Sequence, residues 1–86
     1  MKDLGDWLRK HRESKGLSLE EVCHRTKIRL RYLQAIEEGN YELIPEEVYL
    51  KGFLRSYADA VGLDKEEVIQ RYEVLKKLLP EKRFRD

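Results

Sequence analysis

Glycine and proline residues divide this sequence into short pieces whose lengths suit helices. The breaks lie at Gly16, Gly39, Pro45, Gly62 and Pro80. These two residue types are the ones that most often begin or end helices. Between the breaks, apolar residues recur every three or four positions, as one face of a helix requires, and no alternating strand pattern competes. The sequence therefore predicts an all-α domain of five helices.

Local end signals place these helices at residues 4–14, 18–25, 29–38, 46–61 and 65–79. Ser18 and Glu21 have the spacing of a capping box, in which each side chain accepts a backbone N–H of the other's residue, and Asp64 with Glu67 repeats it. Pro45 suits the first turn of the fourth helix, where its missing N–H costs nothing. We expect residues 40–44 to form a loop. The domain then covers residues 1–80, and residues 81–86 form a basic tail.

Length and composition exclude several classes of protein. An 86-residue chain buries only a modest core, which argues against a deep catalytic cavity. Eighteen Lys+Arg against seventeen Asp+Glu give a net charge of +1, so bulk charge does not point to nucleic acid. His11, His24 and Cys23 lack metal-ligand spacing, and no catalytic motif is present. We therefore expect a non-catalytic binding module that holds no metal and no cofactor.

The second and third predicted helices have the order and spacing of a helix-turn-helix motif. Residues 17–39 resemble the phage-repressor/Cro type of this motif. The residues in register are Leu17, Val22, Cys23, Ile28, Leu33, Ile36, Glu37 and Gly39. The resemblance implies a five-helix, repressor-like domain whose third helix would enter the major groove of DNA.

Several residues depart from the DNA-binding members of this type. Leu19 stands where a polar phosphate contact is usual, and Lys27 stands in the turn where glycine or a similar residue is usual. A helical wheel leaves Leu30 exposed at the reading position, where it would gain at most a thymine methyl. Glu37 and Glu38 would bring negative charge toward the phosphates. These departures favour a protein partner over DNA.

Charge is segregated along the motif. Residues 23–36 contain four cations and no acid, whereas residues 37–47 contain five glutamates and no base. Such a dipolar surface suits a protein partner better than a uniformly negative duplex. A repressor-type DNA-binding regulator stays open as the alternative, as does an ordinary solvated helix face. The candidate DNA contacts are Arg25, Lys27, Arg29, Arg31 and Gln34.

A second resemblance follows from the fourth predicted helix. The block Gly52–Ala58, placed after the repressor-like motif and Ile44–Pro45, resembles the N-terminal cytoplasmic domain of the RodZ family of bacterial cell-shape proteins. The likeness covers nearly all of residues 3–79. It implies a domain under the inner membrane that binds the actin-like filament protein MreB, ahead of a transmembrane span beyond residue 86. Residues 76–86 carry five bases and two acids, as expected before such a span.

The same resemblance assigns filament binding to the fourth helix. Its candidate contacts are Phe53 and Tyr57, an aromatic pair one helical turn apart, with Tyr49, Lys51 and Arg55 as neighbours. The wide apolar arc of this helix is equally compatible with all three aromatic residues lying in the core. We expect these aromatics and the basic turn to occupy different surfaces. A scaffold that only self-associates is the third function that the sequence leaves open.

Overall fold

The computed structural model describes residues 3–78, and within them the chain forms five α-helices and one 3₁₀ helix. They are α1 (Asp3–Ser14), α2 (Leu19–Thr26), α3 (Leu30–Glu38), η1 (Tyr41–Leu43), α4 (Glu47–Val61) and α5 (Lys65–Leu78). The prediction of a five-helix, all-α fold is confirmed. Every described α-helix boundary lies within one residue of the range expected from the sequence. Residue 79 and the basic tail at 81–86 lie outside the described residues.

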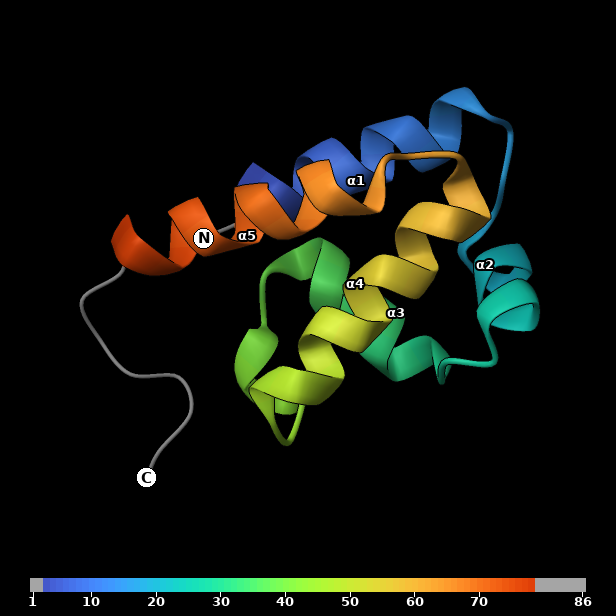
Figure 1. The fold of residues 1–86 in the computed structure, drawn as a ribbon. Coiled ribbons are helices and arrows are strands. Elements are labelled where there is room, and N and C mark those ends of the chain that lie inside the picture. Colours follow the sequence, from blue (N-terminus) through green and yellow to red (C-terminus); the bar gives the residue numbers. More distant parts are fainter. Residues whose placement is uncertain (1–2, 79–86) are drawn as a thin grey trace.

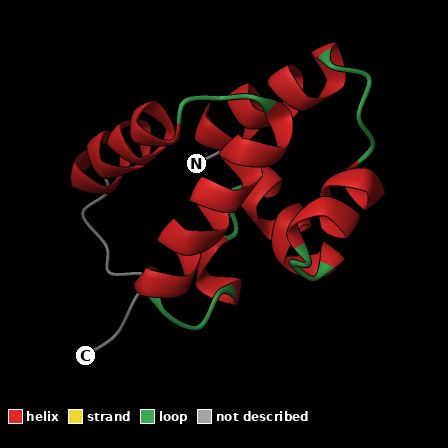
Figure 2. Cartoon of the chain, turned by 45° about the vertical axis from the view of Figure 1, so that its right-hand side comes forward, coloured by secondary structure: helices red, strands yellow, loops and turns green. Residues whose placement is uncertain are grey.

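The helices enclose one core. Figure 1 shows α1 and α5 side by side and running in opposite directions, with α4 crossing below them. Helix α4 packs against both α5 and α2, while α3 packs against both α1 and α2. Short loops join the helices, as the rotated view in Figure 2 shows. The helix-turn-helix pair α2–α3 is therefore held from two directions, by α4 and by α1.

Side-chain caps explain where two of the helices begin. The capping box at α2 is confirmed, because Ser18 Oγ accepts the Glu21 N–H at 3.1 Å and the Ser18 N–H donates to Glu21 Oε1 at 2.8 Å. At α5 the expected box between Asp64 and Glu67 does not form, and Asp64 alone caps the helix. The Asp64 carboxylate accepts the Glu66 N–H at 2.9 Å, but Glu67 pairs instead with an arginine one turn later along α5.

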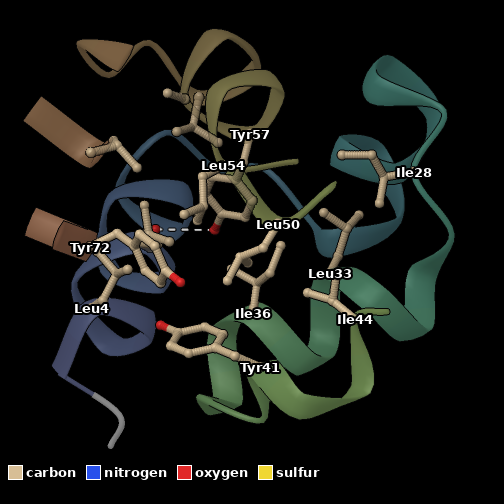
Figure 3. Close-up of a cluster of buried hydrophobic side chains, with 14 of the residues drawn as sticks. Leu4, Ile28, Leu33, Ile36, Tyr41, Ile44, Leu50, Leu54, Tyr57 and Tyr72 are labelled. Carbon is tan, nitrogen blue, oxygen red and sulfur yellow. Dashed lines mark hydrogen bonds between the residues drawn. The ribbon is translucent and has the colours of Figure 1, made fainter. Parts of the chain in front are cut away.

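The segment between α3 and α4 differs from the expected loop. Tyr41–Leu43 form the 3₁₀ helix η1, which closes with a 3.0 Å hydrogen bond from the Ile44 N–H to the Tyr41 carbonyl. Tyr41 and Ile44 are each 1% exposed, and the Tyr41 ring meets the Tyr72 ring edge-on at 6.1 Å (Figure 3). This segment is therefore one wall of the core. Pro45 lies just before the N-cap of α4, not within the first turn.

A charged pair is buried beside this core. Arg12 of α1 and Glu37 of α3 are 9% and 5% exposed, and they form a bidentate ion pair with hydrogen bonds of 2.7 and 3.0 Å. The Tyr57 hydroxyl of α4 donates to Glu37 Oε2 at 2.5 Å and lies 3.2 Å from the Leu8 carbonyl oxygen. The expectation that Glu37 faces a DNA duplex is therefore wrong, because its carboxylate is buried and its hydrogen bonds join three helices.

The network keeps both of its proton donors protonated. The hydrogen bond to Glu37 raises the pKa of Arg12 above its ordinary value, against the opposing effect of burial. Burial, reinforced by the hydrogen bond to Glu37, raises the pKa of Tyr57. Arg12 therefore stays charged and Tyr57 stays a donor at neutral pH.

We predict that Glu37→Gln lowers the free energy of unfolding by about 3 kcal/mol, because it leaves the buried Arg12 charge without its counter-ion. Urea unfolding followed by circular dichroism measures this loss. The double variant Arg12→Met with Glu37→Leu removes both charges, so it should lose less stability than Glu37→Gln alone. A Glu37→Gln variant as stable as the parent would show that the pair does not join the helices in solution.

A second ion pair joins α4 to α5 nearer the surface. Glu47 Oε2 accepts from Lys76 Nζ at 2.5 Å and from the Tyr72 hydroxyl at 2.9 Å. The hydrogen bond from Lys76 lowers the pKa of Glu47 below its ordinary value of 4.5. Because the pKa is lower in the folded state, this contact stabilises the fold fully above about pH 4.5 and loses its effect as the pH falls through the lowered pKa.

We predict that Glu47→Gln lowers the free energy of unfolding by about 0.5–1 kcal/mol at pH 7, as is usual for a partly exposed pair. Stability curves of parent and variant, measured from pH 7 downward, should converge as the pH falls below 4.5 and through the lowered pKa of Glu47. A difference that does not shrink as the pH is lowered would mean that the Glu47 charge does not contribute and that only side-chain packing changed.

Candidate functional site

The turn between α2 and α3 holds a lysine in a conformation that favours glycine. Lys27 has a φ of +64°, and it is the only non-glycine residue with positive φ in the described part of the chain. Its N–H donates to the Cys23 carbonyl at 2.8 Å and so closes α2. For a residue with a Cβ this left-handed conformation costs about 1 kcal/mol. The backbone at Lys27 thus has the conformation that would suit the glycine usual at this position of the turn. The Lys27 side chain is exposed.

The candidate DNA contacts are all on the surface. All five candidate side chains are exposed, namely Arg25, Lys27, Arg29, Arg31 and Gln34. Arg25 donates to the Ala60 carbonyl at 3.1 Å, which ties α2 to the end of α4, and the Arg31 guanidinium lies 5.0 Å from the centre of the Tyr32 ring. Leu30 is half-buried, so the expectation of an exposed leucine at the reading position is wrong.

A hollow of about 460 Å³ lies between this turn and α4. Lys27, Arg29 and Tyr32 line it from the helix-turn-helix side, and Tyr49 and Phe53 line it from α4. The Tyr32 and Phe53 rings stack at 5.5 Å with an angle of 29° between their planes. Tyr49 is 53% exposed. We call this feature the turn–α4 hollow; it combines an aromatic lining with a basic rim.

The structure places only two of the five predicted filament contacts in the turn–α4 hollow. Tyr49 and Phe53 line the turn–α4 hollow. Tyr57 is fully buried, so its prediction as a partner contact is wrong: its ring lies in the core in Figure 3, where its hydroxyl donates to the buried Glu37 carboxylate. Lys51 is half-buried and pairs with Glu73 of α5, away from the hollow. Arg55 is exposed outside the hollow.

The expectation of two separate surfaces is also wrong, because the basic turn and the α4 aromatics line the same hollow. Neither Tyr32 nor Val48 was predicted from the sequence to be part of this surface. Val48 is 67% exposed beside Tyr49 and lines the hollow as well. The available signal was the position of Val48, an apolar residue outside the core-facing arc of its helix. Nothing local indicated that Tyr32 would stack on a ring of another helix.

Only three of the five glutamates in residues 37–47 are exposed. Glu37 is buried and Glu47 is tied to α5, which leaves Glu38, Glu42 and Glu46 exposed. Glu38 ends α3, at the opposite end from the basic turn. The charge segregation therefore survives along α3, from a basic beginning to an acidic end.

None of the helices in residues 3–78 has both the length and the hydropathy needed to cross a membrane. Over the same residues, no group of three or more His, Cys, Asp and Glu side chains is arranged to hold a metal ion. A second hollow, of about 500 Å³, lies between α1 and α5, where Val74 and Leu78 are exposed.

Comparison with known proteins gives the family. Residues 7–68 match the model of a helix-turn-helix domain. The chain belongs to this helix-turn-helix family. It is 44% identical over 57 residues to the membrane protein YmfM of Bacillus subtilis, and 39% identical over 72 residues to the cytoskeleton protein RodZ of Streptococcus pneumoniae. The RodZ-like helix-turn-helix domain expected from the sequence is confirmed.

This RodZ-like domain matches one part of longer proteins. The two alignments cover 66% and 84% of this chain but only 20% and 26% of the relatives. A solved structure of YmfM from Staphylococcus aureus, described as a candidate DNA-binding membrane protein, matches with a TM-score of 0.76 and 32% identity. That match covers 83% of this chain and 87% of the solved one, so it confirms the helix-turn-helix fold.

We predict that Lys27→Gly raises the free energy of unfolding by about 0.5 kcal/mol, because relief of the left-handed strain exceeds the extra backbone entropy of glycine. Thermal unfolding should show a midpoint a few degrees higher. The matched control is Lys10→Gly on the exposed side of α1, where glycine interrupts a helix and should destabilise the domain. A destabilised Lys27→Gly variant would show that the left-handed turn is not strained.

Proposed function

We propose that this RodZ-like domain is a non-catalytic adaptor that binds the actin-like filament protein MreB at the cytoplasmic face of the inner membrane. It would thereby link the filament to rod-shape maintenance and cell-wall synthesis. The proposal of a filament partner is supported by the relative named cytoskeleton protein RodZ. The proposed location is supported by the relative named as a membrane protein. In this proposal a membrane span beyond residue 86 anchors the domain.

The observation that carries the proposal is the aromatic lining of the turn–α4 hollow. Tyr49 stands 53% exposed beside the stacked rings of Tyr32 and Phe53. Aromatic side chains gathered in a preformed hollow are typical energetic centres of protein interfaces, because each buries a large area and loses little side-chain entropy. Lys27 and Arg29 on the rim add attraction for an acidic border on the partner.

We predict that Tyr49→Ala weakens binding to polymerised MreB by about tenfold or more, since truncation of an interface aromatic typically costs about 2 kcal/mol. Co-sedimentation with filaments at low and high salt measures this change. The ring is largely exposed, so the fold should be unaffected. Val74→Ala is the matched control, because Val74 is 55% exposed on α5 and lies outside the hollow. Equal losses for both variants would contradict the assignment of this surface.

Repressor-type DNA binding is the second candidate function. It is favoured by the exposure of Arg25, Lys27, Arg29 and Arg31, and by the removal of Glu37 from the surface that would meet phosphates. The solved YmfM relative described as a candidate DNA-binding protein supports it as well. Salt separates the two functions, because each phosphate contact adds about 0.9 to the slope of log affinity against log salt. Binding to an aromatic surface depends much less on salt.

A further inference from the structure

We propose that Gly52 keeps the turn–α4 hollow open for one large apolar side chain of the filament protein, which carries a carboxylate beside that side chain. This inference rests on the proposed function and deepens it, because it names the group that the hollow receives and the residue that admits it. The partner side chain would lie directly against the α4 backbone at Gly52, where no side chain of the domain intervenes.

Gly52 is the one glycine for which the described residues give no structural reason. Of the five glycines in the chain, three have a positive φ close after the end of a helix, namely Gly16, Gly39 and Gly62. A Cβ on Gly5 would collide with the α3 backbone. Gly52 has neither requirement, and it lies inside α4, where glycine is the least favourable residue apart from proline. Its presence therefore weakens the helix without a return in packing.

The space that a side chain at Gly52 would occupy is empty and belongs to the hollow. A Cβ built there meets no atom within 4 Å beyond its chain neighbours and its own helix backbone. Gly52 lines the turn–α4 hollow, and so do Val48 and Ser56, which lie one turn before it and one turn after it. Gly52 is therefore at the centre of the α4 wall, and its missing side chain is part of the volume of the hollow.

The lining of the hollow indicates an apolar occupant. Aromatic rings come from Tyr32, Tyr49 and Phe53, and aliphatic side chains come from Ile28 and Val48. The volume of about 460 Å³ lies within the range of ~300–1,000 Å³ that is usual for pockets that hold small organic molecules. A phenylalanine, leucine or methionine side chain of the partner therefore fits, and its burial removes apolar surface of both proteins from water.

Charge at the rim indicates an acidic neighbour on the partner. Lys27 and Arg29 line the hollow, and none of the described residues that line it is acidic. Neither cation has an ion-pair partner among residues 3–78. Glu46, the N-cap of α4, is exposed just before the lining residues of that helix. A carboxylate on the partner is therefore attracted to the turn and repelled by the beginning of α4, which fixes the direction of the bound segment.

The test uses Gly52→Ala and Gly52→Leu in the whole 86-residue chain. Both variants replace a glycine inside a helix with a better helix former, so the midpoint of thermal unfolding should rise, by about 3–8 °C for Gly52→Ala. Both also fill part of the hollow. Co-sedimentation with polymerised MreB should therefore show an apparent Kd raised about fivefold or more for Gly52→Ala, and further for Gly52→Leu. Stability and binding then change in opposite directions, which partial unfolding cannot produce.

Asp59→Ala is the matched control, because Asp59 is exposed on the same helix and lies outside the hollow. It should leave the Kd for filaments unchanged. A loss of binding equal to that of Gly52→Ala would show that any change in α4 acts alike, and would overturn the inference.

Arg29→Glu tests the carboxylate on the partner. It should raise the Kd more at about 0.1 M salt than at about 1 M, because the Debye length falls from about 10 Å to about 3 Å between them. A loss that is equal at both salt concentrations, or a gain in affinity, would overturn the assigned chemistry of the partner.

The remaining outcomes separate the inference from the proposed function. If the parent chain does not pellet with filaments, the proposed function is wrong and the inference falls with it. If the parent and both Gly52 variants pellet equally well, the adaptor function stands and the inference is wrong. Sedimentation velocity of the chain alone tests a different occupant. A dimer that Gly52→Leu converts to a monomer would place a second copy of the chain in the hollow, and that also overturns the inference.

Discussion

The hydrogen bonds among Arg12, Glu37 and Tyr57 set the rotation of three helices, and the lining of the turn–α4 hollow depends on that rotation. Successive residues of α4 are about 100° apart around its axis. With the Tyr57 ring held inward, Phe53 lies about 40° and Tyr49 about 80° around the helix from it. The exposed fractions increase in the same order: Tyr57 is fully buried, Phe53 is half-buried and Tyr49 is 53% exposed. The same anchor that buries one aromatic residue therefore presents the other two to the turn–α4 hollow.

Close backbone approach makes this anchor reachable. A Cβ on Gly5 would lie 2.2 Å from the Glu37 carbonyl oxygen, so only glycine lets α1 lie directly on the end of α3. Two turns further along α1, Arg12 extends to the Glu37 carboxylate. A buried ion pair seldom adds net stability over an apolar equivalent, but it stabilises one rotation of each helix against its alternatives, because any other leaves a charge unpaired. In this domain the pair acts through orientation more than through energy.

The helices themselves could be predicted, and the surface could not, for a physical reason. Helix limits depend on neighbours within four residues, such as Ser18 with Glu21, and these are visible in the sequence. The rotation of α4 depends on Glu37, which is 20 residues from Tyr57 in the sequence and is of a type usually found on the surface. Without that contact, the apolar arc of α4 gave no reason to separate Tyr57 from Tyr49. The stacking of Tyr32 on Phe53 and the pairing of Lys51 with Glu73 are likewise contacts between helices.

The meeting of cations and aromatics in one hollow is a consequence of the repressor-like arrangement itself. Helix α2 packs on α4, and the Arg25 guanidinium binds the Ala60 carbonyl, so the turn that follows α2 must lie beside the earlier turns of α4. Any side chain at the positions of Tyr49 and Phe53 would then border the turn. In a domain of this kind, aromatic residues added to α4 do not create a second surface remote from the helix-turn-helix motif. They modify the border of the surface that the motif already presents, so the fold brings aromatic and basic side chains to the same hollow.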